Sequence, residues 1–133
     1  MTSELRVDNL KGSTTGGSIS VLGEGTSATT NLQQGLVKLW VHFSGDASGA
    51  ASNDSFNVSG MTDTGTGDYE VAINNNMGNA FYACGVAGRV SGNISFDDGG
   101  NNSTSSVGIG ALADGNSRDD ANAIGVLLAG DLA

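Results

Sequence analysis

The sequence predicts an all-β protein: an antiparallel β-sandwich or a small, jelly-roll-like barrel, preceded by an extended N-terminal segment. Apolar and polar residues alternate over short stretches, which is the two-residue period of a β-strand. Glycine, asparagine and aspartate separate these stretches about every ten residues, a spacing typical of sandwiches and barrels. No window places apolar residues along one helical face, although residues 110–124 leave room for a short helix, which their glycines weaken.

The composition limits the size of the core. The chain has 133 residues, enough for one ordinary domain or for a smaller domain with an extension. It contains 22 glycines and no proline, and only 5% of its residues are aromatic. Charged residues make up 14%, well below the usual share of roughly a quarter. We therefore expect a small core built from short strands that tight turns connect.

The strongest strand pattern lies in residues 36–43. Its two faces consist of Val37, Leu39, Val41 and Phe43 on one side, and Leu36, Lys38, Trp40 and His42 on the other. A strand with large residues on both faces is expected to be buried on both sides or covered by a neighbouring copy. We expect the packed β domain to begin here and to span residues 36–133.

Residues 1–35 are predicted to form an N-terminal extension. Residues 4–9 alternate as a half-buried strand does, and residues 18–22 form a second short strand, whereas residues 23–35 hold almost nothing apolar except Leu32. Two such strands cannot bury enough surface to fold alone. We expect this extension to pack on the following domain, on a neighbouring copy or on another protein; the alternative is a loose terminus.

The remaining strands follow the same logic. Alternation predicts strands over residues 54–61, 68–74, 80–90, 89–96, 107–111 and 123–128. The first two of these form a β-hairpin through residues 62–67, and Phe56 and Val58 are expected to share a face. The longest exposed loops are expected over residues 44–53, 97–106 and 113–120.

The charge excludes several classes of partner. The formal net charge is −9, and no basic cluster is present to neutralise phosphates, so we expect neither a nucleic-acid partner nor an anionic membrane surface. No stretch approaches the roughly 18 apolar residues of a membrane span, and we expect no membrane insertion. The acidic start lacks the apolar core of a secretory signal, which predicts synthesis in a cytoplasm.

Few residues could perform chemistry. His42 is the only histidine, and its place in mid-strand beside Trp40 favours a structural role over that of a catalytic base. Cys84 is the only cysteine, so no disulfide can form within the chain, and we expect it to be a small buried apolar residue. Together these two residues are too few for zinc.

Acidic loop residues are the other candidates, namely Asp63, Asp68, Asp97 and Asp98. The stretch 63–68 resembles an acidic calcium loop, but aspartate with glycine is also ordinary turn chemistry, which we favour. A carboxylate pair for glycoside hydrolysis could join distant strands, yet no pair stands out. Trp40, Tyr69 and Tyr82 would be the sugar-stacking aromatics, but each lies in a core-like strand. We expect no enzyme, no metal and no cofactor, and the sequence nominates no binding residue.

Five segments together form a recognisable series, namely ELRVDNL (4–10), NLQQGLVKLW (31–40), DSFNVS (54–59), DTGTGDY (63–69) and the ending GDLA (130–133). They resemble segments of small tail-fibre and virion structural proteins of marine and cyanobacterial tailed phages. They occur in the same order and span nearly the whole chain. The resemblance implies a part of a virion, made in the host cytoplasm, and it transfers no site residue because the family has no agreed binding motif.

Fibres and capsid decorations are commonly homotrimers, in which contacts between subunits cover strand edges. We therefore expect a trimeric tail-fibre or spike component that mediates host-surface adhesion. Residues 1–35 would attach it to other virion proteins or intertwine between protomers, and its loops would meet a host glycan or protein. The alternatives are a capsid decoration (cement or head-fibre) protein that stabilises the shell, and a glycan-degrading enzyme.

Overall fold

The computed structural model describes residues 4–23, 28–46, 49–97, 102–115 and 117–133. The chain divides into two compact units, Met1–Leu36 and Val37–Ala133. This division falls one residue after the boundary expected from the sequence. Each unit is described by itself.

The N-terminal unit contains one small antiparallel pair, β1 (Ser20–Leu22) and β2 (Thr29–Asn31), in which Ser20 lies opposite Asn31. The Asn31 side chain holds the pair together: its Nδ2 donates to the Gly17 carbonyl at 2.6 Å, and its Oδ1 accepts from the Gln33 N–H at 2.9 Å. The β1 strand was expected, although it is shorter than residues 18–22. The β2 strand was not expected, because its residues lack any apolar alternation.

The prediction of a half-buried strand over residues 4–9 is wrong for the single chain. Residues 4–10 lie outside all strands, and Leu5 and Val7 are 75% and 55% exposed. Alternation shows that a segment suits a sheet, but a strand forms only where a neighbouring strand accepts its hydrogen bonds.

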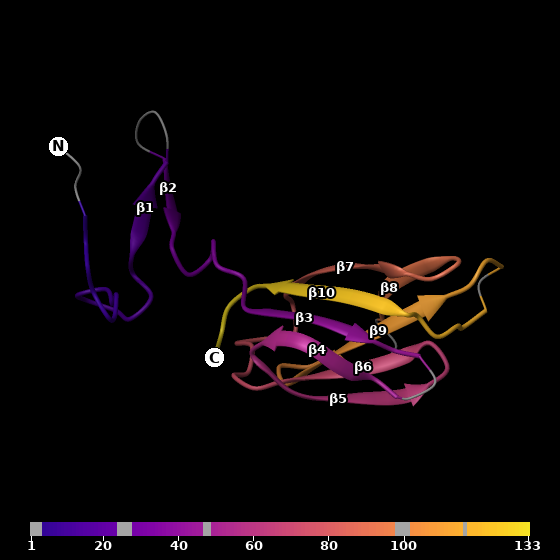
Figure 1. Cartoon of the computed structure of the whole chain (residues 1–133). Coiled ribbons are helices and arrows are strands. Elements are labelled where there is room, and N and C mark those ends of the chain that lie inside the picture. The colour runs from indigo at the N-terminus through magenta and orange to yellow at the C-terminus, as the bar shows by residue number, and fades with distance from the viewer. Residues whose placement is uncertain (1–3, 24–27, 47–48, 98–101, 116) are drawn as a thin grey trace. The chain divides into compact units, whose positions relative to one another are not determined.

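The second unit is an antiparallel β-sandwich. Its strands are β3 (Leu39–Ser44), β4 (Ala51–Phe56), β5 (Val58–Gly65), β6 (Asp68–Ile73), β7 (Ala83–Arg89), β8 (Asn93–Asp97), β9 (Ser106–Leu112) and β10 (Ala123–Ala129). They form two four-stranded sheets in the orders β4-β3-β10-β7 and β5-β6-β9-β8 (Figure 1). The all-β prediction is confirmed, with a sandwich and not a closed barrel. The described residues contain no helix, including the described part of 110–124.

The core lies between the central strands of the two sheets. Alternate residues of β3, β6, β9 and β10 are buried there: Leu39, Val41, Phe43, Tyr69, Val71, Ile73, Val107, Ile109, Ala111, Ile124, Val126 and Leu128. The rings of Phe43 and Tyr69 meet edge to face across the sheets, with centroids 5.3 Å apart. The inward face expected for residues 36–43 is thus confirmed for Leu39, Val41 and Phe43, whereas Val37 is exposed.

The strand expected over residues 54–61 is in fact two strands in different sheets. Asn57 has a φ of 61°, and it separates β4 from β5. Its Nδ2 donates to the Lys38 carbonyl at 2.9 Å, and its Oδ1 accepts from the Asn75 N–H at 2.7 Å. Phe56 is therefore exposed on one sheet while Val58 packs against the core from the other, so the two do not share a face. An alternating pattern does not reveal where a chain changes sheet.

The predictions for the hairpin, the later strands and the first loop agree more closely with the structure. The hairpin of β5 and β6 is present, but β5 continues to Gly65, so the connection is shorter than residues 62–67. Strands β7 to β10 occupy most of the ranges expected for them. The first exposed loop is shorter than residues 44–53, because β4 begins at Ala51.

Candidate functional site at the loop end of the sandwich

Several connections meet at one end of the sandwich, which we call the loop end (described residues 45–46, 49–50, 65–68, 113–115 and 117–122). Strand β3 ends here and β6 begins here. Two of the three loops expected to be exposed, 44–53 and 113–120, are thus brought together. The third is not: the Ile73 N–H donates to the Ser105 carbonyl at 2.8 Å, which fixes residues 102–105 at the opposite end. Asp98 lies outside the described residues, as does the side chain of Asp97.

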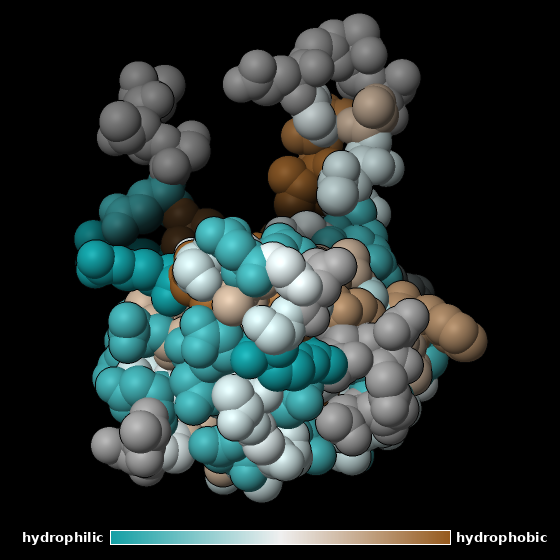
Figure 2. All heavy atoms as spheres, turned by 90° about the vertical axis from the view of Figure 1, so that its right-hand side faces the viewer, coloured by the Kyte–Doolittle hydropathy of each residue, from teal (hydrophilic) through white to brown (hydrophobic). Residues whose placement is uncertain are grey.

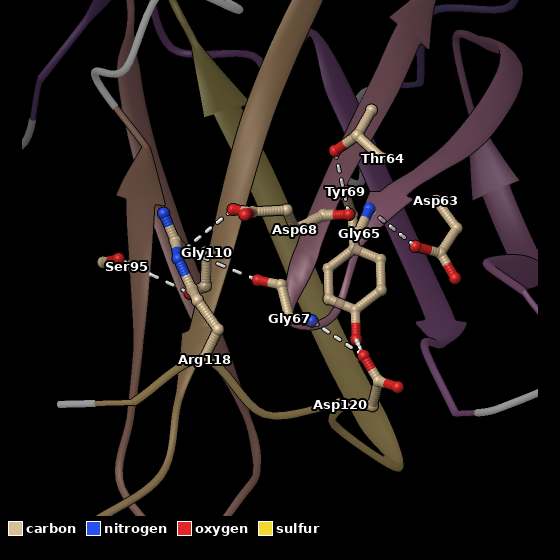
Figure 3. Close-up of polar contacts among 10 residues, drawn as sticks. All are labelled: Asp63, Thr64, Gly65, Gly67, Asp68, Tyr69, Ser95, Gly110, Arg118 and Asp120. Atoms are coloured by element: carbon tan, nitrogen blue, oxygen red, sulfur yellow. Dashed lines mark hydrogen bonds and ion pairs between the residues drawn. The ribbon is translucent and has the colours of Figure 1, made fainter. Parts of the chain in front are cut away.

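The Tyr69 hydroxyl is the centre of the loop end. It lies 2.8 Å from the Gly45 carbonyl oxygen, and it accepts from the Ala121 N–H at 3.2 Å. Its third contact is with Oδ1 of Asp120 at 3.2 Å, and Figure 3 draws this pair. Burial raises the pKa of Tyr69 to about 12; the Ala121 N–H opposes this shift and the negative charge of Asp120 adds to it. The phenol therefore stays protonated at neutral pH and joins the β3–β4 and β9–β10 connections.

Asp120 connects a third segment to this centre. Its Oδ1 accepts from the N–H of Gly67 at 2.7 Å, so it binds the turn between β5 and β6. Gly67 has a φ of +67°, and a Cβ atom there would lie 2.5 Å from the Ala111 carbonyl oxygen. Only glycine fits a left-handed backbone pressed this closely against β9.

Arg118 lies beside this cluster and forms an ion pair with Asp68, with Nη1 2.9 Å from Oδ1. The same nitrogen lies 3.5 Å from the Gly67 carbonyl oxygen, and the guanidinium occupies the space that a Cβ on Gly110 would fill. Both side chains are about one-third exposed (38% and 34%), so this pair adds little stability. Its geometric effect is to hold the β9–β10 loop against the β5–β6 turn.

The acidic stretch 63–68 has the contacts of a turn. Asp63 Oδ1 accepts from the Gly65 N–H at 3.0 Å, and Thr64 Oγ1 donates to the Asp68 carbonyl at 3.0 Å. Across the described ranges, no three His, Cys, Asp or Glu side chains converge as a metal site would require. The carboxylates of Asp63, Asp68 and Asp120 do not share a partner: each forms its own hydrogen bonds or ion pair within the protein.

The surface of the loop end is polar. Figure 2 views the sandwich from this end, and the described atoms there are mostly hydrophilic. Fixed, polar loops on a rigid sandwich suit recognition of a hydrophilic surface. Sequence reasoning missed this cluster, because Tyr69 and Asp120 lie 51 residues apart in the chain.

The two residues first considered for chemistry lie elsewhere. His42 is exposed on the outer face of β3, with Nδ1 3.2 Å from Nδ2 of Asn53. Cys84 is partly buried in β7, and burial raises the pKa of its thiol to about 11, so it remains protonated at neutral pH. Within the parts described, neither contacts a catalytic partner, and neither belongs to the loop end.

The outer face of the β4-β3-β10-β7 sheet carries a row of apolar residues, the Trp40 face: Phe56, Trp40, Leu127 and Gly85. The three large side chains are 53%, 38% and 45% exposed. Among the described residues, no element of the sandwich covers Trp40, so the first alternative expected for residues 36–43, burial of both faces within one chain, is wrong. The second alternative, cover by a neighbouring copy, stays a prediction. Among the aromatics considered for sugar stacking, Tyr69 and Tyr82 are buried and Trp40 is exposed.

No family model, curated protein or solved structure matches the chain. In the part of the chain that is described, no helix is long and apolar enough to cross a membrane. The function is therefore inferred from the chain's own residues and geometry.

Proposed function

We propose that this protein is a structural subunit of a bacteriophage particle, a homotrimeric tail-fibre or spike component that mediates adhesion to the host surface. The observation that carries the proposal is the contrast between the two units. One has a complete core, and the other has none.

The N-terminal unit buries none of its described residues. Its apolar side chains are exposed or only partly buried, and those most exposed are Leu5, Val7, Leu10, Val21, Leu22 and Leu36. Apolar surface of this kind gains stability when another surface covers it. A segment that completes its packing on a neighbouring copy or on another virion protein is what an anchored subunit requires.

The sandwich supports the outward-facing role. Its chain enters at Val37, next to the start of β3, and β3 runs towards Gly45 at the loop end. The polar loops therefore lie at the end opposite this entry. The Tyr69 and Asp120 contacts fix them, so little conformational entropy would be lost when they bind a host glycan or protein.

The sequence supports the phage assignment. The segments that resemble tail-fibre and virion structural proteins include the start of the chain (residues 4–10), the entry into the sandwich (31–40) and the β5–β6 hairpin turn (63–69). The structure gives the last of these a clear role, since this stretch supplies the turn that Asp120 binds.

A capsid decoration protein is the second candidate, and the Trp40 face favours it. A sheet face with exposed Trp40, Leu127 and Phe56 suits packing against the surface of a shell. In that case the sandwich would lie on the capsid and stabilise it, and adhesion would play no part.

Electron cryomicroscopy of the intact particle tests both candidates, since it locates the subunit on the tail or on the shell. Copy number from gel densitometry gives a second answer: tens of copies indicate fibres, and hundreds indicate decoration. Light scattering of the purified protein should report three copies, and a monomeric mass would contradict the trimer. Release of reducing ends from host polysaccharide by the purified protein would contradict a non-enzymatic role.

A further inference from the structure

Strand β7 is a sheet edge that is open to another strand. It pairs with β10 along all seven of its residues without a register shift, and none of the described residues pairs with its other side. Alternate backbone N–H and C=O groups of β7 therefore point away from the sheet. In Figure 1, β7 runs along the margin of the sandwich beside β10.

The other three edges of the sandwich each have a feature that blocks strand addition. Strand β4 carries Asp54 and lies across a register shift at His42 and Phe43. Strand β5 carries Asp63 and has two register shifts, and β8 is only five residues long. By contrast, β7 is regular, made of small residues, and charged only at Arg89, its last position. Natural proteins seldom leave such an edge uncovered.

The N-terminal unit contains a segment that fits this edge, the arm (residues 4–9). Arg6 and Glu4 form an ion pair with Nε 2.7 Å from Oε1, as two side chains on one side of an extended chain do. Leu5 and Val7 lie between them in the alternation and are exposed. Among the described residues, the arm has no backbone hydrogen bonds to any strand.

We propose that the arm of one copy adds to β7 of a second copy as an antiparallel strand. The side-chain patterns of the arm and of β7 determine which side of the added strand faces the core. In β7, Cys84 and Val86 pack against the core and remain only partly buried, whereas Arg89 is on the outer side. Placing Leu5 and Val7 on the core side extends this apolar layer and puts Glu4, Arg6 and Asp8 on the outer side.

Charge then selects the register. An antiparallel arm with Glu4 opposite Arg89 places Val7 opposite Val86 and Asn9 opposite Cys84. The acidic start of the arm thus meets the only charged residue of β7. Leu5 faces Gly88, where the Ile94 side chain already lies against the backbone.

Arm addition explains two separate observations, the regular open edge and the alternating segment without a strand partner. Since each copy has one arm and one β7, the contact is head-to-tail, and it forms a closed ring when the rotation between successive copies divides a full turn, as the proposed trimer requires. It requires self-association, which the proposed function includes, but it does not require a place in a virion. It is therefore testable on the purified full chain.

Disulfide trapping with the native Cys84 tests the register. Directly opposed residues of antiparallel strands have Cα atoms about 4.5–5.5 Å apart, within the range of a disulfide. In the full chain carrying Asn9→Cys, oxidation with diamide at about pH 9, where a fraction of the partly buried Cys84 thiol is ionised, should link position 9 of one copy to Cys84 of another. Non-reducing gels should then show species of two and three chains, with the 9–84 peptide pair identified by mass spectrometry.

Asp8→Cys is the matched control, since it lies in the same exposed arm but on the opposite face of the added strand. It should cross-link to Cys84 about tenfold more slowly, because a one-residue offset reverses the face. Equal cross-linking of both variants, no 9–84 link between chains, or a product of single-chain mass would overturn the proposal. A trimer by light scattering without this link would overturn arm addition and leave the proposed function standing.

Discussion

The Tyr69 hydroxyl lies 3.2 Å from Oδ1 of Asp120, and the two residues join three connections that are far apart in the chain. Tyr69 contacts the Gly45 carbonyl, Asp120 accepts from the Gly67 N–H, and the Ala121 N–H donates to the phenol. Because Tyr69 also packs on Phe43, the same side chain belongs to the core and to the loop end. The stability of the sandwich and the shape of its loops are thus coupled.

A double-mutant cycle measures this coupling. Tyr69→Phe should lower the free energy of unfolding by about 1–3 kcal/mol, because the Ala121 N–H loses its acceptor in a buried site. Asp120→Ala should cost at least as much, since it leaves the buried N–H of Gly67 without an acceptor. Urea unfolding of the single and double variants should show an interaction of at least about 0.5 kcal/mol.

The control is Asp114→Ala, an exposed aspartate in the same connection, which should unfold within about 0.5 kcal/mol of the parent chain. Strict additivity of Tyr69→Phe and Asp120→Ala would show that the two side chains act independently.

Alkaline pH should destabilise the sandwich. Burial raises the pKa values of Tyr69 and Tyr82 from 10.0 to about 12, so the folded chain holds these protons more tightly than the unfolded chain does. The contribution of these two phenols to the free energy of unfolding is complete below pH 10, and it is lost as the pH rises towards about 12. The loss is about 2–3 kcal/mol for each phenol, because one pKa unit corresponds to about 1.4 kcal/mol.

Cys84 adds a loss of stability that begins at a lower pH, since burial raises the pKa of its thiol from 9.0 to about 11. Urea unfolding between pH 8 and 12 should therefore be measured in a Cys84→Ala background, with Tyr82→Phe to isolate Tyr69. These are the only two tyrosines, so ultraviolet titration of the folded chain reports on them alone. In the Tyr82→Phe variant, a phenol that titrates at its ordinary pKa would contradict the burial of Tyr69.

Gly67 should be the least replaceable residue of the β5–β6 hairpin. Gly67→Ala places a side chain on a left-handed backbone and sets its Cβ 2.5 Å from the Ala111 carbonyl oxygen, so we expect a loss of about 2 kcal/mol or more. Gly60→Ala in the same hairpin is the control, because nothing lies within 4 Å of its Cβ and its φ is not positive. It should be neutral or stabilising by up to about 1 kcal/mol in thermal unfolding. Equal losses would show that the turn is not constrained by β9.

The sequence was most informative about the central strands. In β3 and β6, apolar residues alternate cleanly, and Leu39, Val41 and Val71 are buried as the two-residue period requires. It was least informative where pairing decides the outcome. The same alternation at Leu5 and Val7 gives no strand in the single chain, because no neighbouring strand is available there.

The loop end was not predictable, for a related reason. Tyr69 and Asp120 are separated by 51 residues, and their contact depends on the pairing of β6 with β9 and on the path of the loop that follows β9. The turn contact of Asp63 is local, and the sequence predicted it. The acceptor of the Gly67 N–H is Asp120, which is distant in the chain, and the sequence did not predict it. Likewise, nothing in the sequence showed that the outer face around Trp40 is uncovered.

The sandwich should fold without the N-terminal unit. All buried apolar side chains among the described residues belong to Val37–Ala133, and the first of them along the chain is Leu39. Removing residues 1–36 therefore deletes no part of this core. A chain of residues 37–133 should unfold in one cooperative transition. At low protein concentration, its free energy of unfolding should equal that of the full chain.

Calorimetry at two concentrations separates this prediction from the effect of assembly. If arms join copies, the full chain gains stability as its concentration rises, whereas the shortened chain does not. The two should therefore agree in Tm when dilute and diverge when concentrated. A shortened chain that melts lower even at high dilution would mean that the N-terminal unit stabilises the sandwich within one chain.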